Sequence, residues 1–289
     1  EITTNPEEEG AGTTKWLVHP AFTSNANYGG GFGEISGMWV GKFEATGEYV
    51  DGDASKVSVK PGVESLRTMS INDQYKAGKI ATYGESTNLN SHMVKNSEWG
   101  AIVYLAHSKY GTNKQKVEQN KSSEYYTGGT NAVEEIYTAN KKQSTTHNAT
   151  GIYDLNGGAW EYTASYVNNG HENLEKNGGF KQGDLYGATE EEQSMSTKYK
   201  TVYSSENNEE KDYEESGKRM KGDAVYEISS TYSENVGAWW EAVASFPYTS
   251  NPFFARGGFS SYDYAGVFCF LQGDGAAGDN GSPRLVLVP

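Results

Sequence analysis

The sequence predicts a single α+β domain with long loops, on three observations. Apolar residues recur at helical spacing through Asn96–Tyr110, whereas two short runs near the end of the chain, Ala265–Leu271 and Arg284–Val288, have the length and apolar character of strands. Gly, Asn, Ser and Tyr are abundant, which is typical of many loops and few long helices. The chain has 289 residues, enough to bury a core, and no linker or internal repeat divides it.

The N-terminal part of the sequence predicts a flexible segment, a strand and a helix. Residues 1–14 are polar and expected to be flexible, so that the domain itself covers residues 15–289. Ser36–Thr46 alternates large side chains in the manner of a strand. Pro61–Lys79 contains a short helix, for which Ser70 is the expected N-cap and Gly78 the expected end.

Asn96–Tyr110 is the strongest helix candidate. Asn96 or Ser97 can cap it, Glu98 lies in the first turn, and Gly111 lies just past its end. Apolar residues at helical spacing share one face, which we expect to pack on the core. They are Trp99, Ile102, Val103, Ala106 and Tyr110.

The middle of the chain predicts a turn followed by a strand, and then an insertion. Gly151–Tyr166 contains a Gly-Gly pair and a strand that carries Trp160, Tyr162 and Ala164 on one face. Residues 167–223 are charged and too long for a simple loop, so a surface excursion is expected, with a helix near Glu190–Tyr199.

The C-terminal stretch combines small residues with aromatic residues of the kind found at binding surfaces. Alternation predicts that Ala265–Leu271 is half buried, with Val267 and Cys269 pointing one way and Phe268 and Phe270 the other. Before this run, Phe259–Tyr264 follows a Gly-Gly pair and mixes aromatic, hydroxyl and carboxylate side chains. Glycine lets a backbone approach a partner, and Tyr and Phe supply rigid contact area, so the composition favours a set of binding loops. A Gly-rich irregular sheet edge is the alternative.

Charge and cysteine content exclude several classes of protein. The net charge of −14 opposes binding to nucleic acid, which needs a basic surface, and to an anionic membrane. Cys269 is the one cysteine, so an intrachain disulfide or a cysteine-rich metal site cannot form. The chain has no apolar run long enough to span a bilayer.

Three blocks of the sequence resemble the formylglycine-generating-enzyme and sulfatase-modifying-factor group, whose domains have a C-type lectin fold. They are NSEWGAIVYLAHSKYG at 96–111, GIYDLNGGAWEYT at 151–163 and ARGG…PRLVLV at 255–288. Two positions depart from the family pattern, Gly158 in place of Asn and Tyr162 in place of a second Trp. The resemblance implies two helices and a small, twisted, mostly antiparallel sheet containing Trp160–Tyr166, Ala265–Phe270 and Leu285–Val288.

The same resemblance assigns roles to several core residues. Trp99, Trp160 and Phe268 should be largely buried, each contributing on the order of 2–3 kcal/mol through apolar burial. Arg256 and Arg284 are expected to be structural clamps at strand ends.

The resemblance is closer still to one branch, the variable proteins of bacterial diversity-generating retroelements. It rests on an R-G-G-x(6)-A-G-V-F-x-F pattern, a Gly/Asn/Asp-rich loop and a final strand, and it implies that 255–289 is the variable region. Adenine-directed mutagenesis of Asn codons would limit variable positions to residues encoded by codons that end in a pyrimidine. Between Phe259 and Ser282 only Gln272 breaks that limit, so Gln272 is expected to be fixed.

The sequence lacks the residues with which the related families catalyse their reactions, and the chain is therefore expected not to be an enzyme. Formylglycine generation needs a cysteine pair, and His19, His92, His107, His147 and His171 are too scattered to suggest an iron site. His107 is expected to pack or cap the helix. No cofactor is expected, although a structural calcium remains an alternative among the many Asp and Asn side chains.

Asp154 and Glu161 could be a catalytic carboxylate pair. The resemblance instead assigns them to turn and core hydrogen bonding.

The predicted function is non-catalytic binding by one contiguous, solvent-exposed face, whose aromatic members anchor the partner. Its residues are Phe259, Ser260, Ser261, Tyr262, Asp263, Tyr264, Cys269, Leu271, Asp274, Ala276, Ala277, Asp279, Asn280 and Ser282. Trp239 and Trp240 are expected to border it or to lie in the core, while Gly266, Val267, Phe268 and Phe270 should be buried. An open face without a deep polar pocket favours a protein or other macromolecular partner. A degenerate enzyme and a structural surface protein are the alternatives.

The resemblance also implies a location. The expected place is the bacterial cell surface or outside the cell, with any membrane attachment through an anchor before Glu1.

Overall fold

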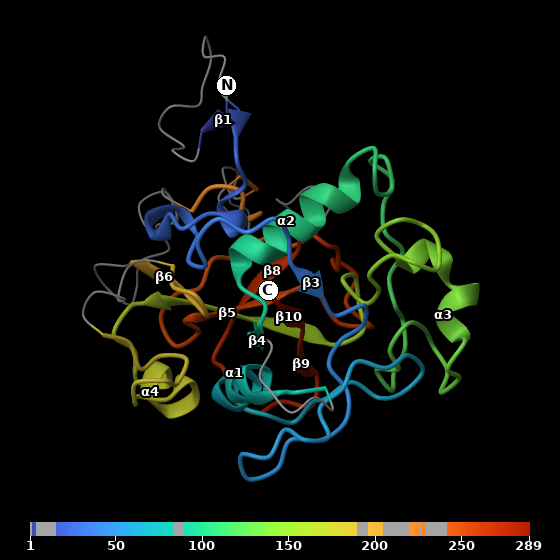
Figure 1. Cartoon of the computed structure of the whole chain (residues 1–289). Helices are drawn as coiled ribbons and strands as arrows, with labels where there is room; N and C mark the ends of the chain where they lie inside the picture. The colour runs from blue at the N-terminus through green and yellow to red at the C-terminus, as the bar shows by residue number, and fades with distance from the viewer. Residues whose placement is uncertain are drawn as a thin grey trace.

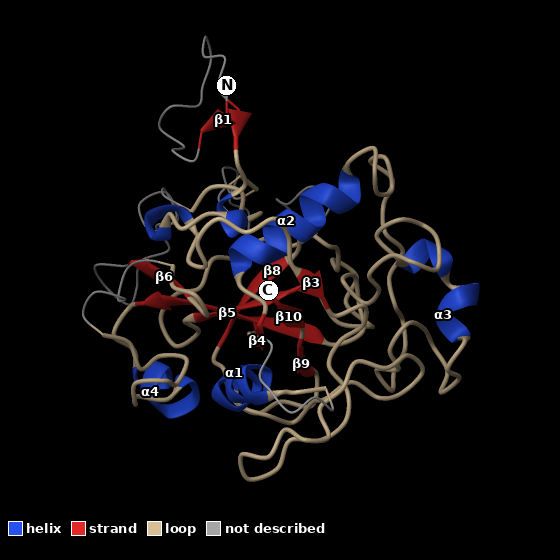
Figure 2. Cartoon of the chain, in the orientation of Figure 1, coloured by secondary structure: helices blue, strands red, loops and turns tan. Residues whose placement is uncertain are grey.

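The structure is a computed structural model that describes residues 2–3, 16–83, 90–189, 196–204, 220–225, 227–228 and 242–289. Helix α2 lies on one side of the strands, and α1 and α4 lie on the other (Figures 1 and 2). The α-helices are α1 (Ile71–Ile80), α2 (Asn96–His107), α3 (Ile136–Ala139) and α4 (Glu172–Gly178), and short 3-10 turns are η2 (Pro20–Phe22), η3 (Ala26–Tyr28) and η4 (Lys141–Gln143). The strands are β1 (Ile2–Thr3), β2 (Trp16–Leu17), β3 (Trp39–Val40), β4 (Ser91–Met93), β5 (Trp160–Asn168), β6 (Thr201–Ser204), β7 (Phe253–Arg256), β8 (Phe270–Gly273), β9 (Gly281–Pro283) and β10 (Leu285–Leu287). The predicted α+β class is confirmed.

Strand β5 is the centre of a five-stranded sheet with the order β6-β5-β7-β8, to which β9 is added beside β5. β9 pairs with the first residues of β5 and β6 with the last, so both occupy the edge of β5 opposite β7. β6 and β9 run parallel to β5, whereas β7 and β8 form an antiparallel pair beside it. This sheet is therefore mixed, not mostly antiparallel as predicted, because parallel pairing becomes possible once a long connection such as 169–200 returns the chain.

A second sheet has the order β3-β10-β4 and is antiparallel throughout. The expectation that the last strand shares a sheet with β5 is wrong. The chain leaves the edge of β5 after Pro283, and β10 begins at Leu285 in the other sheet. Arg284, between the two strands, points into the interior and is fully buried.

Helix α2 begins and ends close to where the sequence predicts. Its N-cap is Lys95 instead of Asn96 or Ser97, and the Glu98 carboxylate accepts from the Lys95 N–H at 2.8 Å. The helix ends at His107, because the chain turns at Ser108, whose carbonyl accepts from the Gly111 N–H. The expected core face is confirmed except at its end, since Tyr110 lies beyond the helix and is 73% exposed. The four other side chains of that face, Trp99, Ile102, Val103 and Ala106, are buried.

Helix α1 confirms Ser70 as an N-cap, since its hydroxyl accepts from the Asp73 N–H. The helix continues past Gly78, the predicted end, to Ile80. A Cβ at Gly78 would lie 2.7 Å from the backbone nitrogen of Met93, so this glycine allows β4 to pack directly on the helix. It is a packing residue and not a stop signal.

Three other stretches differ from their predictions. Within 36–46 only β3 is a strand, and the following residues bend so that Phe43 and Glu44 are both buried. The Ala265–Leu271 run starts with a turn, closed by the Cys269 N–H and the Gly266 carbonyl, and becomes strand only at Phe270. It is also buried on both sides instead of one.

The insertion at 167–223 has its helix, α4, at Glu172–Gly178. The helix expected near 190–199 is not found in its described part, because Thr197–Lys200 is a turn and 190–195 lie outside the described residues.

The predicted core positions are confirmed. Trp99 is completely buried, Phe268 is 1% exposed and Trp160 is 9% exposed. His107 is a packed helix residue, with its ring centroid 4.9 Å from that of Phe268. No helix in the described ranges is long and apolar enough to cross a membrane.

Candidate ligand-binding face

The first loop of the candidate face, 259–264, follows a sharp reversal of the chain after β7. Gly257 and Gly258 both have positive φ, of 81° and 80°. A Cβ at Gly258 would lie 2.5 Å from the Cβ of Ala265, so the two ends of the loop meet where only glycine fits. The Gly266 N–H donates to the Gly257 carbonyl and closes the base of the loop.

Loop 259–264 is held mainly through its own backbone. The Ser260 N–H donates to the Gly158 carbonyl at 2.8 Å, and the Tyr262 N–H donates to the Phe259 carbonyl at 3.0 Å. From a distant part of the chain, Gln119 Nε2 lies 3.0 Å from the carbonyl oxygens of both Phe259 and Tyr262. These contacts fix the path of the loop without using the loop's side chains.

The aromatic side chains of this loop form a continuous cluster over Trp160. The Phe259 and Tyr262 rings are stacked with centroids 5.7 Å apart, and Tyr264 meets Tyr262 edge-on at 6.0 Å. The Trp160 ring lies 5.3 Å from Tyr262 and 6.1 Å from Phe259. Of the three rings in the loop, those of Phe259 and Tyr262 are half buried, and Tyr264 is 43% exposed.

The second loop, 274–280, is also held by its backbone carbonyls. The Gly275 carbonyl accepts from the Ile71 N–H, the N-terminal residue of α1, and the Gly278 carbonyl accepts from the Thr68 N–H. The Asp274 and Asp279 carbonyls accept from the side chains of Asn177 and Arg67, respectively. Among its side chains, Asp274, Ala277 and Asp279 are exposed and Ala276 and Asn280 half buried.

Both loops meet at the first residue of β5. The Trp160 ring packs under loop 259–264, and the Trp160 N–H donates to the Asn280 carbonyl at 2.7 Å. The half-buried Leu271 pairs with Ala255 of β7, which in turn pairs with Tyr162, and this places Leu271 on the same side of the sheet as Trp160. We call loops 259–264 and 274–280 together with Leu271 the C-terminal face.

Three residues predicted to be exposed on this face are buried. Ser282 of β9 pairs with Glu161 of β5, so its side chain points to the inner side of the sheet and is completely buried. Cys269 is completely buried in the turn before β8, and burial raises the pKa of its thiol. Ser260 is 6% exposed, because its N–H bonds to Gly158 and draws it under the loop. These positions are corrections to the predicted exposed set.

The neighbours predicted to be buried are buried, namely Gly266, Val267, Phe268 and Phe270. Trp239 and Trp240 lie outside the described residues. Gln272 pairs with Phe254 and so lies on the opposite side of β8 from Leu271.

Beneath the face lies a cluster of buried carboxylates around one guanidinium. Arg284 Nε donates to Glu161 Oε2 at 2.7 Å, and its two other nitrogens donate to the carbonyls of Gly41 and Tyr153. Asp154, at φ 64°, accepts from Asn120 Nδ2 at 2.9 Å and from the Gly128 N–H at 2.8 Å. We call Glu44, Asp154, Glu161 and Arg284 the carboxylate cluster. The contacts of Arg284 are those of the predicted structural clamp, and those of Asp154 and Glu161 are the predicted turn and core hydrogen bonds.

Burial raises the pKa of all three carboxyl groups in this cluster, Glu44, Asp154 and Glu161. For Glu44 the pKa is raised well above its ordinary value, first by burial and then by the charges of Asp154 and Glu161. Burial raises the pKa of Glu161 to about 7, against the opposing effect of Arg284. Among the described residues, the Glu44 side chain accepts a single hydrogen bond, from the Ala159 N–H at 2.8 Å, so its neutral form is favoured more than that of the two other carboxyl groups.

Arg256 is also an interior residue. Its guanidinium is completely buried, donates from Nη2 to the Ala224 carbonyl at 3.0 Å, and lies against the Trp99 and Phe270 rings. Among the described residues, no group of three or more His, Cys, Asp or Glu side chains is placed to hold a metal ion.

Sequence reasoning missed two members of the site. Trp160 was expected only in the core, yet it is the floor on which loop 259–264 rests. Gln119 lies in a polar stretch that gave no pattern, and its side chain contacts a loop 140 residues away in sequence.

In comparisons with known proteins, no protein-family model matches this chain, and no curated protein sequence matches it.

Proposed function

We propose that this chain is a non-catalytic ligand-binding protein whose C-terminal face contacts a protein or other macromolecular partner. The carrying observation is that both loops of the face are held mainly through backbone groups and by side chains from outside them, with one bond from a loop side chain, Asp274, which accepts from the Ala276 N–H at 3.0 Å. Such loops can change their exposed side chains and keep their path. The aromatic cluster supplies rigid contact area, the usual source of interface energy.

The same arrangement supports a role as the variable region of a diversity-generating-retroelement protein, with a C-type lectin fold of the formylglycine-generating-enzyme type. The quoted motifs support this, as does the glycine reversal at 257–258 that opens the variable loop. We place the protein at the bacterial cell surface or outside the cell on the same grounds. The variable positions would then be the exposed and half-buried side chains of the C-terminal face, without Ser260, Cys269 and Ser282.

A pair of display libraries tests this function. One library randomises exposed positions of the face, Ser261, Asp263, Tyr264, Asp274, Ala277 and Asp279. The control randomises exposed positions around α3, Glu134, Glu135, Thr138, Ala139, Lys141 and Lys142. Both should contain mostly folded variants, and only the face library should yield binders when selected on lysozyme and on streptavidin. Equal yields from the two libraries, or widespread unfolding in the face library, would refute the proposal.

The genomic locus gives an independent test of diversification. A near-identical template repeat and a reverse transcriptase gene are expected downstream of the coding sequence. If both are missing, the retroelement proposal fails while the binding proposal stands on the library result.

A further inference from the structure

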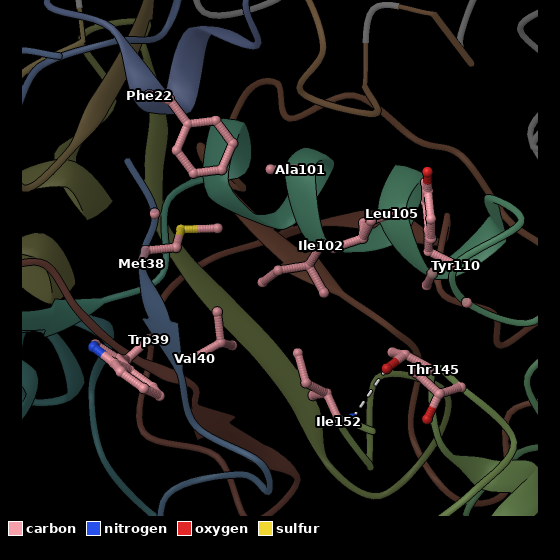
Figure 3. A pocket seen from close by; sticks show the side chains of 14 residues that line it. Phe22, Met38, Trp39, Val40, Ala101, Ile102, Leu105, Tyr110, Thr145 and Ile152 are labelled. Carbon is pink, nitrogen blue, oxygen red and sulfur yellow. Dashed lines mark hydrogen bonds between the residues drawn. The ribbon is translucent and has the colours of Figure 1, made fainter. Parts of the chain in front are cut away.

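An apolar cavity of about 420 Å³ lies between β3, α2 and the segment 145–152, outside the C-terminal face (Figure 3). The volume is in the range of natural ligand sites. No lining residue carries a charge, and the polar side chains are two threonines and a tyrosine. The lining residues are Phe22, Gly37, Met38, Trp39, Val40, Ala101, Ile102, Leu105, Ala106, Tyr110, Gly111, Thr145, Thr146 and Ile152.

The rim of this cavity carries large apolar side chains that are unusually exposed. Trp39 is 74% exposed, Tyr110 73% and Leu105 60%, which places them among the most exposed large hydrophobic residues of the described chain. Leu105 and Tyr110 stand on the α2 side of the cavity, and Met38 and Val40 on the β3 side (Figure 3). Apolar residues that gather around a hollow, instead of lying scattered, indicate an interaction site.

The backbone of β3 offers hydrogen-bonding groups on the edge beside this cavity. Gly41 points toward β10, since its N–H donates to the Leu285 carbonyl and its carbonyl accepts from Arg284. The residues on either side of Gly41 must point the other way. Lys42 does so, because its carbonyl accepts from the Tyr153 N–H at 2.8 Å, next to the cavity-lining Ile152.

Val40 faces the same outer edge but has no such partner. Within the described part of the chain, nothing bonds to its backbone N–H or carbonyl on that edge, and the same holds for Met38. The chain at Ile152 instead turns to bond with Thr145. An open strand edge therefore borders the apolar cavity.

We propose that this groove binds an extended peptide segment of a partner protein, which adds a strand to the outer edge of β3 and places an apolar side chain in the cavity. A peptide supplies both amide groups for Val40 and Met38 and a side chain for the cavity, whereas a hydrocarbon or lipid tail supplies only the second. The neutral lining excludes a charged side chain from the cavity. The net charge of −14 favours basic residues on either side of the apolar one.

The test uses a capped peptide, lysine–threonine–valine–leucine–valine–threonine–lysine, titrated against the isotope-labelled protein to the solubility limit of the peptide. The amide signals of Met38 and Val40 and the methyl signals of Ile102 and Leu105 should shift together. Two N-methylated versions, at odd or at even residues, block one or the other edge of the peptide. At least one of them should bind tenfold more weakly or worse, and so should a version with aspartate in place of leucine.

Matched protein variants distinguish binding in this groove from nonspecific binding to exposed apolar residues. Leu105→Glu puts a charge on the rim and should weaken binding tenfold or more, while Phe180→Glu, at a residue 68% exposed elsewhere, should leave it unchanged. Circular dichroism checks that both variants are folded. The proposal is overturned by no shift at the solubility limit, by equal effects of the two variants, or by N-methylated peptides that all bind like the parent.

Discussion

The C-terminal face and the carboxylate cluster lie on either side of the segment 157–160, yet they are held by different kinds of group. The loops of the face are fixed by backbone bonds, such as that from the Ser260 N–H to the Gly158 carbonyl. The cluster is fixed by side chains, with Arg284 bonded to Glu161 and to two carbonyls. Side-chain changes should therefore be tolerated in the first region and costly in the second. Four predictions test this contrast, from the largest expected effect to the smallest.

Arg284→Met should cost about 3–5 kcal/mol of unfolding free energy, because it leaves Glu161 and the carbonyls of Gly41 and Tyr153 buried without their partner. Urea unfolding at pH 7 measures it. The control is Lys56→Met, which removes an equally short ion pair with Glu48 whose side chains are 72% and 62% exposed, and it should leave the unfolding free energy nearly unchanged because water screens the exposed pair. Similar costs for the two variants would show that the cluster does not hold the core.

Glu44→Gln should make the protein more stable above neutral pH, by roughly 1–3 kcal/mol at pH 8. Burial raises the pKa of Glu44, so the folded state keeps a proton that the unfolded state releases above its ordinary pKa of 4.5. The contribution of Glu44 to the unfolding free energy of the wild type is therefore fully present below pH 4.5 and is lost as the pH rises. The glutamine stays neutral, so its advantage should be absent near pH 4 and grow with pH.

Unfolding of the Glu44→Gln variant and the wild type from pH 4 to pH 8 measures this. Glu118→Gln, at an exposed carboxylate, is the control and should show no such trend. A stability difference for Glu44→Gln that does not change with pH would mean that Glu44 is ionised in the folded protein.

The contrast also explains what could be predicted from sequence. Helical spacing located the buried Trp99, since a face of a helix is set by local residues alone. The exposure of Ser282 was mispredicted, because its side depends on the register with Glu161, a pairing between segments far apart in the chain. The contact of Gln119 with loop 259–264 could not be predicted for the same reason, because only the folded chain brings these distant segments together.

Gln119→Leu should cost about 1–2 kcal/mol, because the carbonyls of Phe259 and Tyr262 lose a donor that a leucine of similar size cannot replace. The amide protons of 260–266 should exchange with solvent faster, which hydrogen exchange followed by mass spectrometry detects. Gln115→Leu, at an exposed glutamine nearby, should change neither quantity. Unchanged exchange in the Gln119 variant would mean that the loop is held without this side chain.

The smallest effect is expected at Tyr264, the most exposed aromatic residue of the C-terminal face. Its ring touches Tyr262 only at an edge and is 43% exposed, so Tyr264→Ala should change the unfolding free energy by less than about 0.5 kcal/mol. The sequence placed Tyr262 on the same exposed face, but its ring packs on Trp160 and Phe259, and Tyr262→Ala should cost about 1–2 kcal/mol. Urea unfolding of the two variants measures the difference, with Tyr110→Ala as a control at an exposed tyrosine outside the face. Against a binder selected on the wild-type face, each alanine should weaken binding by about 1–2 kcal/mol or more. If Tyr264→Ala lowers the unfolding free energy as much as Tyr262→Ala and leaves binding unchanged, then Tyr264 is a core residue. The contrast between a face that tolerates side-chain changes and an interior that does not would then fail at its most exposed aromatic residue.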